Sequence, residues 1–140
     1  MPISKNKKII MGIDPGFAIT GYGLICQEKK KISLVKCGAI TSTTKEPFGP
    51  RLEKIYRELK KIIKKYKPNV IAIEELFFAK NAKTAIKVGQ ARGIAILVAC
   101  QNRTPIKEFT PLQVKQAITG YGFATKTQIQ KMIKLLLNLK

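Results

Sequence analysis

The sequence predicts an α/β domain whose mixed five-stranded sheet is flanked by helices. Three observations lead to this prediction: short apolar runs that end in turn residues, segments with the periodicity of amphipathic helices, and the order in which the two alternate. A chain of 140 residues, of which 45% are apolar and 25% charged, has the size and composition of one globular domain. We therefore expect residues 1–140 to form a single domain.

The predicted strands of the first 40 residues form a meander. Residues 8–13 are an apolar run stopped by Asp14-Pro15-Gly16, which is typical of a buried strand that ends in a turn. Residues 18–26 and 31–40 follow as two further strands, joined by a lysine-rich hairpin. A loop rich in Thr, Pro and Gly then covers residues 41–50.

The first predicted helix covers residues 51–66. Its apolar side chains recur at the i, i+3, i+4 and i+7 spacing of an amphipathic helix. Pro50 suits the first turn of this helix, and Pro68 prevents it from continuing. The lysines that crowd its end are favoured there by the helix dipole.

The second half of the chain alternates between strands and helices. Residues 70–74 predict a buried strand, and Asn81 is a suitable N-cap for a helix that runs to about residue 101. The side chains expected to face inward from this helix are Ala85, Val88, Ile94, Ala95 and Val98.

A short edge strand over residues 104–109 and a helix over residues 111–118 come next, and Thr125 caps a last helix that extends through residue 137. The element order β-β-β-α-β-α-β-α-α, with right-handed crossovers, is that of a ribonuclease H-like fold.

The charge balance restricts the possible functions. The chain has 27 Lys and Arg against 8 Asp and Glu, a net charge of +19, and no histidine, which excludes catalytic triads and metal sites that need an imidazole. Three widely spaced cysteines fit no disulfide framework and suit a reducing cytoplasm. Nucleic acid is the expected partner of so basic a chain, and no apolar run is long enough for a membrane span.

Two carboxylates are the candidate catalytic residues. Asp14 is the only aspartate, and it ends the first strand, as Glu74 ends the fourth. If these strands are parallel neighbours, both side chains reach the same edge of the sheet, whereas the adjacent Glu75 faces away. Paired carboxylates without His or Cys select a hard cation, either Mg²⁺ or Mn²⁺. The alternative is that Asp14 only bonds the backbone of its turn.

Several motifs follow one another with consistent spacing. They are Met11-Gly-Ile-Asp-Pro-Gly16 with Thr20-Gly-Tyr-Gly23, Ile71-Ala-Ile-Glu-Glu-Leu-Phe77 with Ala79-Lys-Asn81, Gly89-Gln-Ala-Arg-Gly93, Gln113-Val-Lys115, Gly120-Tyr-Gly122 and Lys126-Thr-Gln128. From Ile9 to Leu137 this series resembles the RuvC-type Holliday-junction resolvases.

The resemblance implies a magnesium-dependent endonuclease of DNA recombination and repair. Such an enzyme acts as a homodimer that binds a four-way DNA junction, makes paired symmetric nicks and works with a branch-migration motor. The resemblance also implies that Asp14 and Glu74 bind the metal and that Phe77 stacks on an unpaired base. Lys115 and Lys126 match basic positions near the cleaved strand.

One part of the family pattern has no match. The family carries two further acids in a C-terminal Asp-x-x-Asp helix, whereas the last acidic residue here is Glu108. We therefore expect a domain that is truncated relative to the family. Two readings follow: a resolvase whose sequence is incomplete, or a dimer that binds junction DNA without cleaving it. An ATPase of the sugar-kinase or chaperone type, whose fold also opens with Gly-Ile-Asp, needs a much longer chain.

Overall fold

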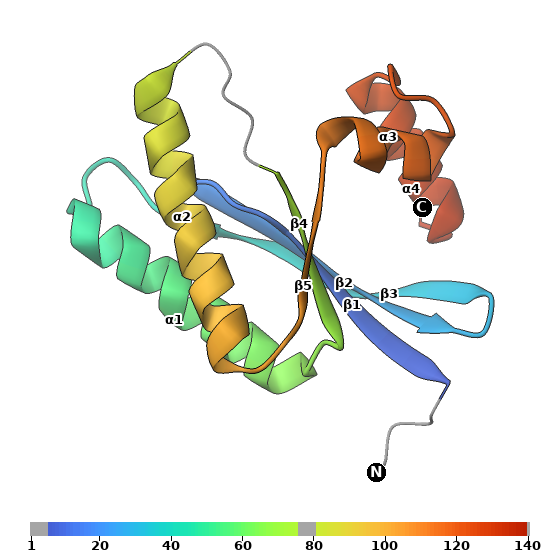
Figure 1. Cartoon of the computed structure of the whole chain (residues 1–140), viewed down its shortest axis with the longest axis horizontal. Coiled ribbons are helices and arrows are strands. Elements are labelled where there is room, and N and C mark those ends of the chain that lie inside the picture. Colours follow the sequence, from blue (N-terminus) through green and yellow to red (C-terminus); the bar gives the residue numbers. More distant parts are fainter. Residues whose placement is uncertain (1–5, 76–80, 140) are drawn as a thin grey trace.

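A computed structural model describes residues 6–75 and 81–139 and confirms the predicted α/β fold. The five strands lie in the order β3-β2-β1-β4-β5 (Figure 1). β1, β2 and β3 form the antiparallel meander, whereas β4 runs parallel to β1 and β5 parallel to β4. The strands are β1 (Lys7–Asp14), β2 (Ile19–Glu28), β3 (Lys31–Thr41), β4 (Val70–Glu74) and β5 (Ile106–Phe109).

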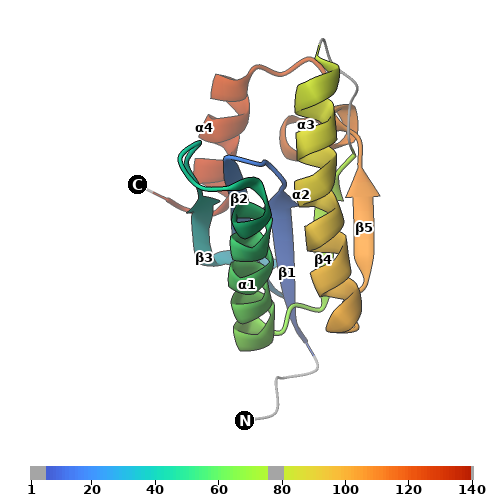
Figure 2. The ribbon, with the colours of Figure 1, turned by 90° about the vertical axis from the view of Figure 1, so that its left-hand side faces the viewer.

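The helices lie on both sides of this sheet. They are α1 (Phe48–Tyr66), α2 (Ala82–Gln101), α3 (Pro111–Thr119) and α4 (Lys126–Leu136). α1 and α2 lie side by side over one face, and α3 and α4 lie on the opposite side, as the two perpendicular views show (Figures 1 and 2). No helix within the described ranges combines the length and apolar character that a membrane crossing needs.

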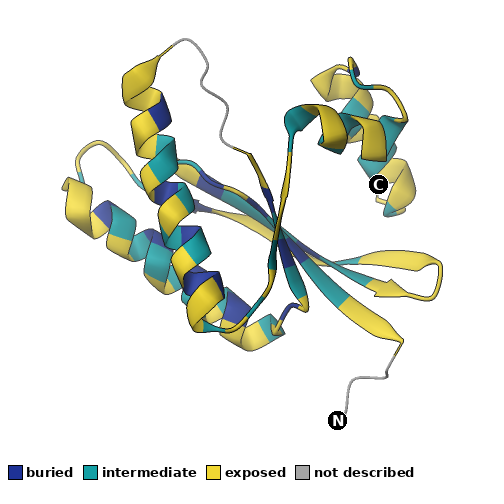
Figure 3. Cartoon of the chain, in the orientation of Figure 1, coloured by how far each residue is buried: buried dark blue, intermediate teal, exposed yellow. Residues whose placement is uncertain are grey.

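The hydrophobic core fills the space between the sheet and the α1–α2 pair (Figure 3). The central strands contribute alternate side chains, because successive residues of a strand face opposite sides of a sheet. Those that face the helices and are buried are Met11, Ile13, Leu24, Ile71 and Ile73. Against them pack Ile55, Leu59 and Ile63 of α1 and Ala91, Ala95 and Val98 of α2.

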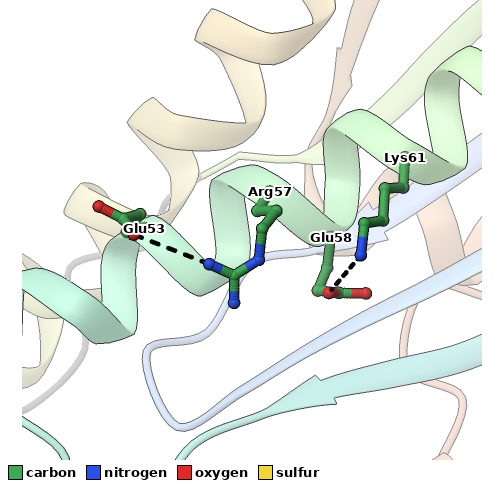
Figure 4. A network of polar contacts seen from close by, with 4 residues as sticks. All are labelled: Glu53, Arg57, Glu58 and Lys61. Atoms are coloured by element: carbon green, nitrogen blue, oxygen red, sulfur yellow. Dashed lines mark ion pairs between the residues drawn. The ribbon is translucent and has the colours of Figure 1, made fainter.

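Helix α1 has the amphipathic character that its spacing predicts. Its outer face carries the ion pairs Glu53–Arg57, at 3.7 Å, and Glu58–Lys61, at 3.5 Å (Figure 4). Exposed pairs of this kind contribute little stability, so burial of the inner face is what holds the helix in place. The helix begins at Phe48, three residues earlier than predicted, because a proline at position 50 fits a first helical turn.

Helix α2 differs from expectation in which side chains it buries. Ala85, Ala95 and Val98 are buried as predicted, but Val88 and Ile94 are only half-buried. Ala91 and Ala99 take their place, because α2 packs closely along α1 and the sheet, where small side chains fit. Apolar residues therefore surround much of this helix, which weakens the periodic signal in its sequence.

Two hydrogen bonds set the register between β1 and β4 at its beginning. The side-chain Oδ1 of Asn69 accepts a bond from the Ile9 N–H at 2.8 Å, and the Asn69 N–H donates to the Ile9 carbonyl, also at 2.8 Å. Register pairing then proceeds from Ile10 with Val70 to Ile13 with Ile73. Asn69 thus aligns the strands that carry the two candidate carboxylates.

Candidate active site

Asp14 and Glu74 lie at the carboxyl ends of neighbouring parallel strands. Each follows directly after the last register pair of β1 and β4, which joins Ile13 to Ile73. Ile13 and Ile73 point into the core beneath the helices, so alternation directs Asp14 and Glu74 to the opposite face of the sheet. Both side chains are exposed there, and the charge of Asp14 acts on the Glu74 carboxyl.

A tight turn follows Asp14 and is held by Thr20. The buried Thr20 hydroxyl donates to the Gly16 carbonyl at 2.7 Å and accepts a bond from the Gly16 N–H at 3.3 Å. Position 16 must be glycine, because a Cβ there would lie 2.1 Å from the Ile19 carbonyl oxygen. This turn fixes the backbone that carries Asp14.

The electrostatics of Glu74 connect this residue with Asp14 and Lys115. Although its side chain is exposed, partial desolvation raises the pKa of the Glu74 carboxyl above 4.5, the carboxylate of Asp14 raises it further, and the ammonium of Lys115 opposes the shift. Like charges held close together disfavour ionisation unless a cation balances them. Lys115 supplies one positive charge, and the two carboxylates retain the capacity to hold another cation.

The neighbouring Glu75 takes no part in this arrangement. Its backbone N–H donates to the Phe109 carbonyl at 2.7 Å, which extends the pairing of β4 with β5. Strand alternation directs its side chain away from the face that carries Glu74. That the two adjacent glutamates face opposite sides of the sheet stays a prediction from this alternation.

Lys115 reaches the site because α3 begins immediately after β5. Phe109, the last residue of β5, is paired with Glu74, and Thr110 is the N-cap of α3. The Thr110 hydroxyl accepts the Gln113 N–H at 3.1 Å, and the Gln113 side chain accepts the Thr110 N–H at 2.9 Å. This capping box fixes the direction in which α3 leaves the edge of the sheet.

Of the two other predicted site residues, Lys126 lies within the described part of the chain. Lys126 is the exposed first residue of α4, and it is not among the charged groups that shift the pKa of Glu74, whereas Lys115 is. Phe77 lies outside the described residues.

The groove beside the carboxylates has a volume of about 770 Å³ and separates the sheet from α3 and α4. Its floor includes several glycines, and a Cβ at Gly12 or Gly23 would meet no atom within 4 Å. The two helices supply its apolar wall, which consists of Val114, Ile118, Ile129 and Ile133. Asp14 and Glu74 contribute the acidic groups of the groove.

An exposed aromatic pair was missed by the sequence analysis. Tyr121 and Phe123, in the turn between α3 and α4, pack edge to face with ring centroids 5.8 Å apart, and Phe123 is 78% exposed. The turn depends on Gly120, whose φ of 74° ends α3 in the left-handed region. The sequence does contain a signal for this exposed pair. Two aromatic residues in a glycine turn belong to no apolar repeat that would bury them.

The donors at the edge of the sheet fit one hard divalent cation. Asp14 and Glu74 offer oxygen ligands, which Mg²⁺ and Mn²⁺ prefer, and Mg²⁺ is commonly held by one or two carboxylates plus waters. Throughout residues 6–75 and 81–139, no three His, Cys, Asp or Glu side chains come close enough to form a larger metal cluster. The described site thus has two of the ligands that a two-metal site would need.

An α/β sheet of this order, with acids at the carboxyl edge of its central parallel strands, defines the class of ribonuclease H-like nuclease domains. Residues 10–140 match the family model of RuvC, the crossover junction endodeoxyribonuclease. The chain therefore belongs to the RuvC family.

Individual relatives agree with this assignment. The chain is 54% identical to the crossover junction endodeoxyribonuclease RuvC of Ruminiclostridium cellulolyticum, over 94% of this chain and 79% of that protein. It is also 54% identical to RuvC of Alkaliphilus oremlandii, over 94% of this chain and 80% of the relative.

Solved structures give the same result. The Thermus thermophilus RuvC structure matches with a TM-score of 0.87 at 32% identity, over 94% of this chain and 81% of that one. The same protein in complex with a Holliday junction substrate matches with a TM-score of 0.90 at 30% identity, over 95% and 81% of the two chains. These relatives are nucleases by name, so the prediction of an enzyme is confirmed.

Proposed function

We propose that this protein resolves four-way DNA junctions by metal-dependent hydrolysis of phosphodiester bonds in recombination and repair. The observation that carries the proposal is the convergence of Asp14, Glu74 and Lys115 at one edge of the sheet. The RuvC relatives, one of them solved with a Holliday junction substrate, support the choice of DNA substrate. A net charge of +19 supports binding to a polyanion, and chromosomal DNA would place the enzyme in the cytoplasm.

In this proposal Asp14 and Glu74 hold the divalent cation, with Mg²⁺ as the expected ion and Mn²⁺ as a substitute. A bound cation would polarise the scissile phosphate and neutralise the charge that develops on it. The protein's part is to keep both carboxylates ionised and adjacent, on strands whose register is fixed. A cation between the two carboxylates would offset the repulsion by which Asp14 raises the pKa of Glu74.

The basic and aromatic residues act on the DNA. Lys115 neutralises charge at the scissile phosphate, since its ammonium already acts on Glu74. Lys126, exposed at the start of α4, contacts a phosphate of the same strand. Phe77 stacks on an unpaired base, and the exposed Tyr121–Phe123 pair offers a second aromatic surface on the side of α3 and α4.

Paired nicks require two active sites, and the outer face of α2 supports a homodimer. Ile86 is 62% exposed and Leu97 is 47% exposed, although both are large and apolar. With Gln90 and Gly93 they recur at intervals of four, three and four residues, so they share one helix face. Burying this face against a second copy removes apolar area from water. A branch-migration motor is the further partner that the family implies.

A second candidate function is junction binding without cleavage. The observation that favours it is that no third carboxylate joins Asp14 and Glu74 in the part of the chain the structure describes. We propose instead that the remaining acids lie on a segment that follows residue 140 in the family and covers the apolar groove beneath α3 and α4. The curated relatives are longer than their matched parts, which leaves room for such a segment.

A nicking assay on a mobile four-way junction tests the proposal. We expect Mg²⁺ to support paired symmetric nicks that leave 5′-phosphate and 3′-hydroxyl ends, and EDTA to abolish them. Asp14→Asn and Glu74→Gln should each lower the rate by about a hundredfold or more, because each removes a metal ligand. Glu53→Gln, on the outer face of α1, is the matched control.

The same assay distinguishes the two functions. If the chain binds the junction but nicks it only after an acidic C-terminal helix is appended, the 140-residue chain is a binding module on its own. If neither chain nicks with Mg²⁺ or Mn²⁺, the nuclease proposal is wrong.

A further inference from the structure

The end of the sheet opposite to Asp14 and Glu74 carries a cluster of cations. Two adjacent hollows of about 410 and 470 Å³ open there and share Asn69 in their walls. We call the cations that line them the amino-end surface, because β1 and β4 begin there: Lys7, Lys8, Lys29, Lys64, Lys67 and Arg103. None of the residues that line either hollow is acidic.

Internal ion pairs leave most of this charge unbalanced. Within the described ranges, one ion pair reaches the surface, between Lys7 and Glu28 at 3.8 Å. The other five cations are exposed side chains, so they are available to an outside partner. A negatively charged partner would displace the counterions that now accompany these cations.

Helix dipoles explain only half of the cluster. Lys64 and Lys67 lie at the end of α1, and Arg103 follows the end of α2, where cations are favoured. Lys7 and Lys8 belong to β1, far from any helix terminus in sequence, and Lys29 lies in the turn between β2 and β3. Two helix ends, a strand and a hairpin turn therefore direct positive charge to one place.

The backbone conformation of three of these cations is unusual. Lys29, Lys67 and Arg103 have φ of 57°, 47° and 56°, in the left-handed region that glycine adopts most easily. A side chain there costs about 1 kcal/mol relative to glycine. Three turns that glycine would form more easily thus carry long cationic side chains, and all three face the same surface.

We propose that the amino-end surface is a second binding site for duplex DNA, separate from the cleavage site. The cations are spread over this surface, and amide side chains lie among them. Such an arrangement suits a partner whose negative charges repeat along its length, as the phosphates of DNA do. The surface has no exposed aromatic anchors among its lining residues, which a membrane-binding face would use. The eight residues of β1 span about 23 Å, so the two sites are far enough apart for one protomer to hold two DNA segments.

The choice of duplex DNA rests on the proposed function, whereas the presence of a polyanion site does not. The experiment is therefore a capture assay in EDTA, which does not depend on nicking. A four-way junction fixed to beads is saturated with the full chain, and a labelled 30-base-pair duplex is added. The amount of duplex captured is divided by the amount of protein bound.

The test variant combines Lys64→Gln, Lys67→Asn and Arg103→Asn. Asparagine tolerates the left-handed backbone, so the two turns keep their shape. The control variant combines Lys36→Gln, Lys45→Gln and Lys131→Gln, which removes three exposed cations from other surfaces and changes the net charge equally. Thermal melting verifies that both variants fold.

We expect the control variant to capture as much duplex as the unchanged chain does. The test variant should capture less duplex by a factor of about ten or more. The salt slope of capture should also fall by about 0.9 for each phosphate that the variant no longer neutralises. Equal capture by the two variants overturns the proposal. Capture of duplex RNA without duplex DNA also overturns it, in favour of an RNA site. Failure of the nicking assay alone leaves the capture result standing.

Discussion

At the scale of single residues, the site places two acids where their negative charges repel each other. Burial is the main reason that the pKa of Glu74 is raised, and the carboxylate of Asp14 adds to it. Ionised Glu74 is therefore a destabilising group in the metal-free protein. A folded-state pKa above the unfolded value means that stability is greatest when Glu74 is protonated and is lost as the pH rises through the folded pKa.

Glu74→Gln should for this reason stabilise the metal-free protein at neutral pH. Thermal melting in EDTA, between pH 4 and pH 8, should show a difference from the unchanged chain that appears above about pH 4.5 and then becomes constant. The gain should stay below about 1 kcal/mol, because the carboxylate is largely solvated. With Mg²⁺ the unchanged chain should become the more stable of the two, since the ion stabilises only the chain that binds it.

A constant difference across the whole pH range would contradict this account of Glu74. Glu53→Gln, which removes an exposed acid of α1, is the control for the loss of one negative charge.

At the scale of elements, strand order predicts the positions of the acids, whereas only the family resemblance indicated Lys115. Asp14 and Glu74 end apolar runs, and strand order alone brings the carboxyl ends of β1 and β4 together. Alternation also separates Glu74 from Glu75 without any tertiary information. Lys115 reaches Glu74 only because α3 turns back over the edge of the sheet, which depends on packing that no local pattern records.

The capping box at the start of α3 should control that turn. Thr110→Ala removes the hydroxyl that accepts the Gln113 N–H, and caps of this type contribute about 1 kcal/mol. We expect urea denaturation to show a loss of about 0.5–2 kcal/mol. Thr110→Ser keeps the hydroxyl and should recover most of it. Equal loss in both variants would show that the methyl group of Thr110, rather than its cap, holds α3.

Helix α2 shows a second limit of sequence reasoning. Four of its alanines, at positions 85, 91, 95 and 99, are buried, whereas Ile86 and Leu97 are exposed, so large side chains do not mark the core-facing side. The pattern becomes intelligible if α2 has two partners: the sheet and α1 on one face, and a second copy on the other. One sequence cannot distinguish the two faces, because both are apolar.

At the scale of the whole molecule, the outer face of α2 predicts the oligomeric state. Ile86→Glu combined with Leu97→Glu should convert a dimer into a monomer, because it places two charges in an apolar contact. Sedimentation velocity measures the change. The matched control, Thr127→Glu with Gln130→Glu, adds the same charge to the exposed part of α4 and should leave the dimer intact. A wild-type chain that sediments as a monomer at high concentration would rule out this interface.

The hydrogen bonds between Asn69 and Ile9 bear on chemistry at the far end of the molecule. Strand pairing has a period of two, so a slip of a single position exchanges every side chain between faces. Such a slip in β4 would bring Glu75 to the place of Glu74 and turn an acid toward the core. The choice between two identical side chains, adjacent in sequence, is thus made several residues upstream by an amide at the opposite end of the strand.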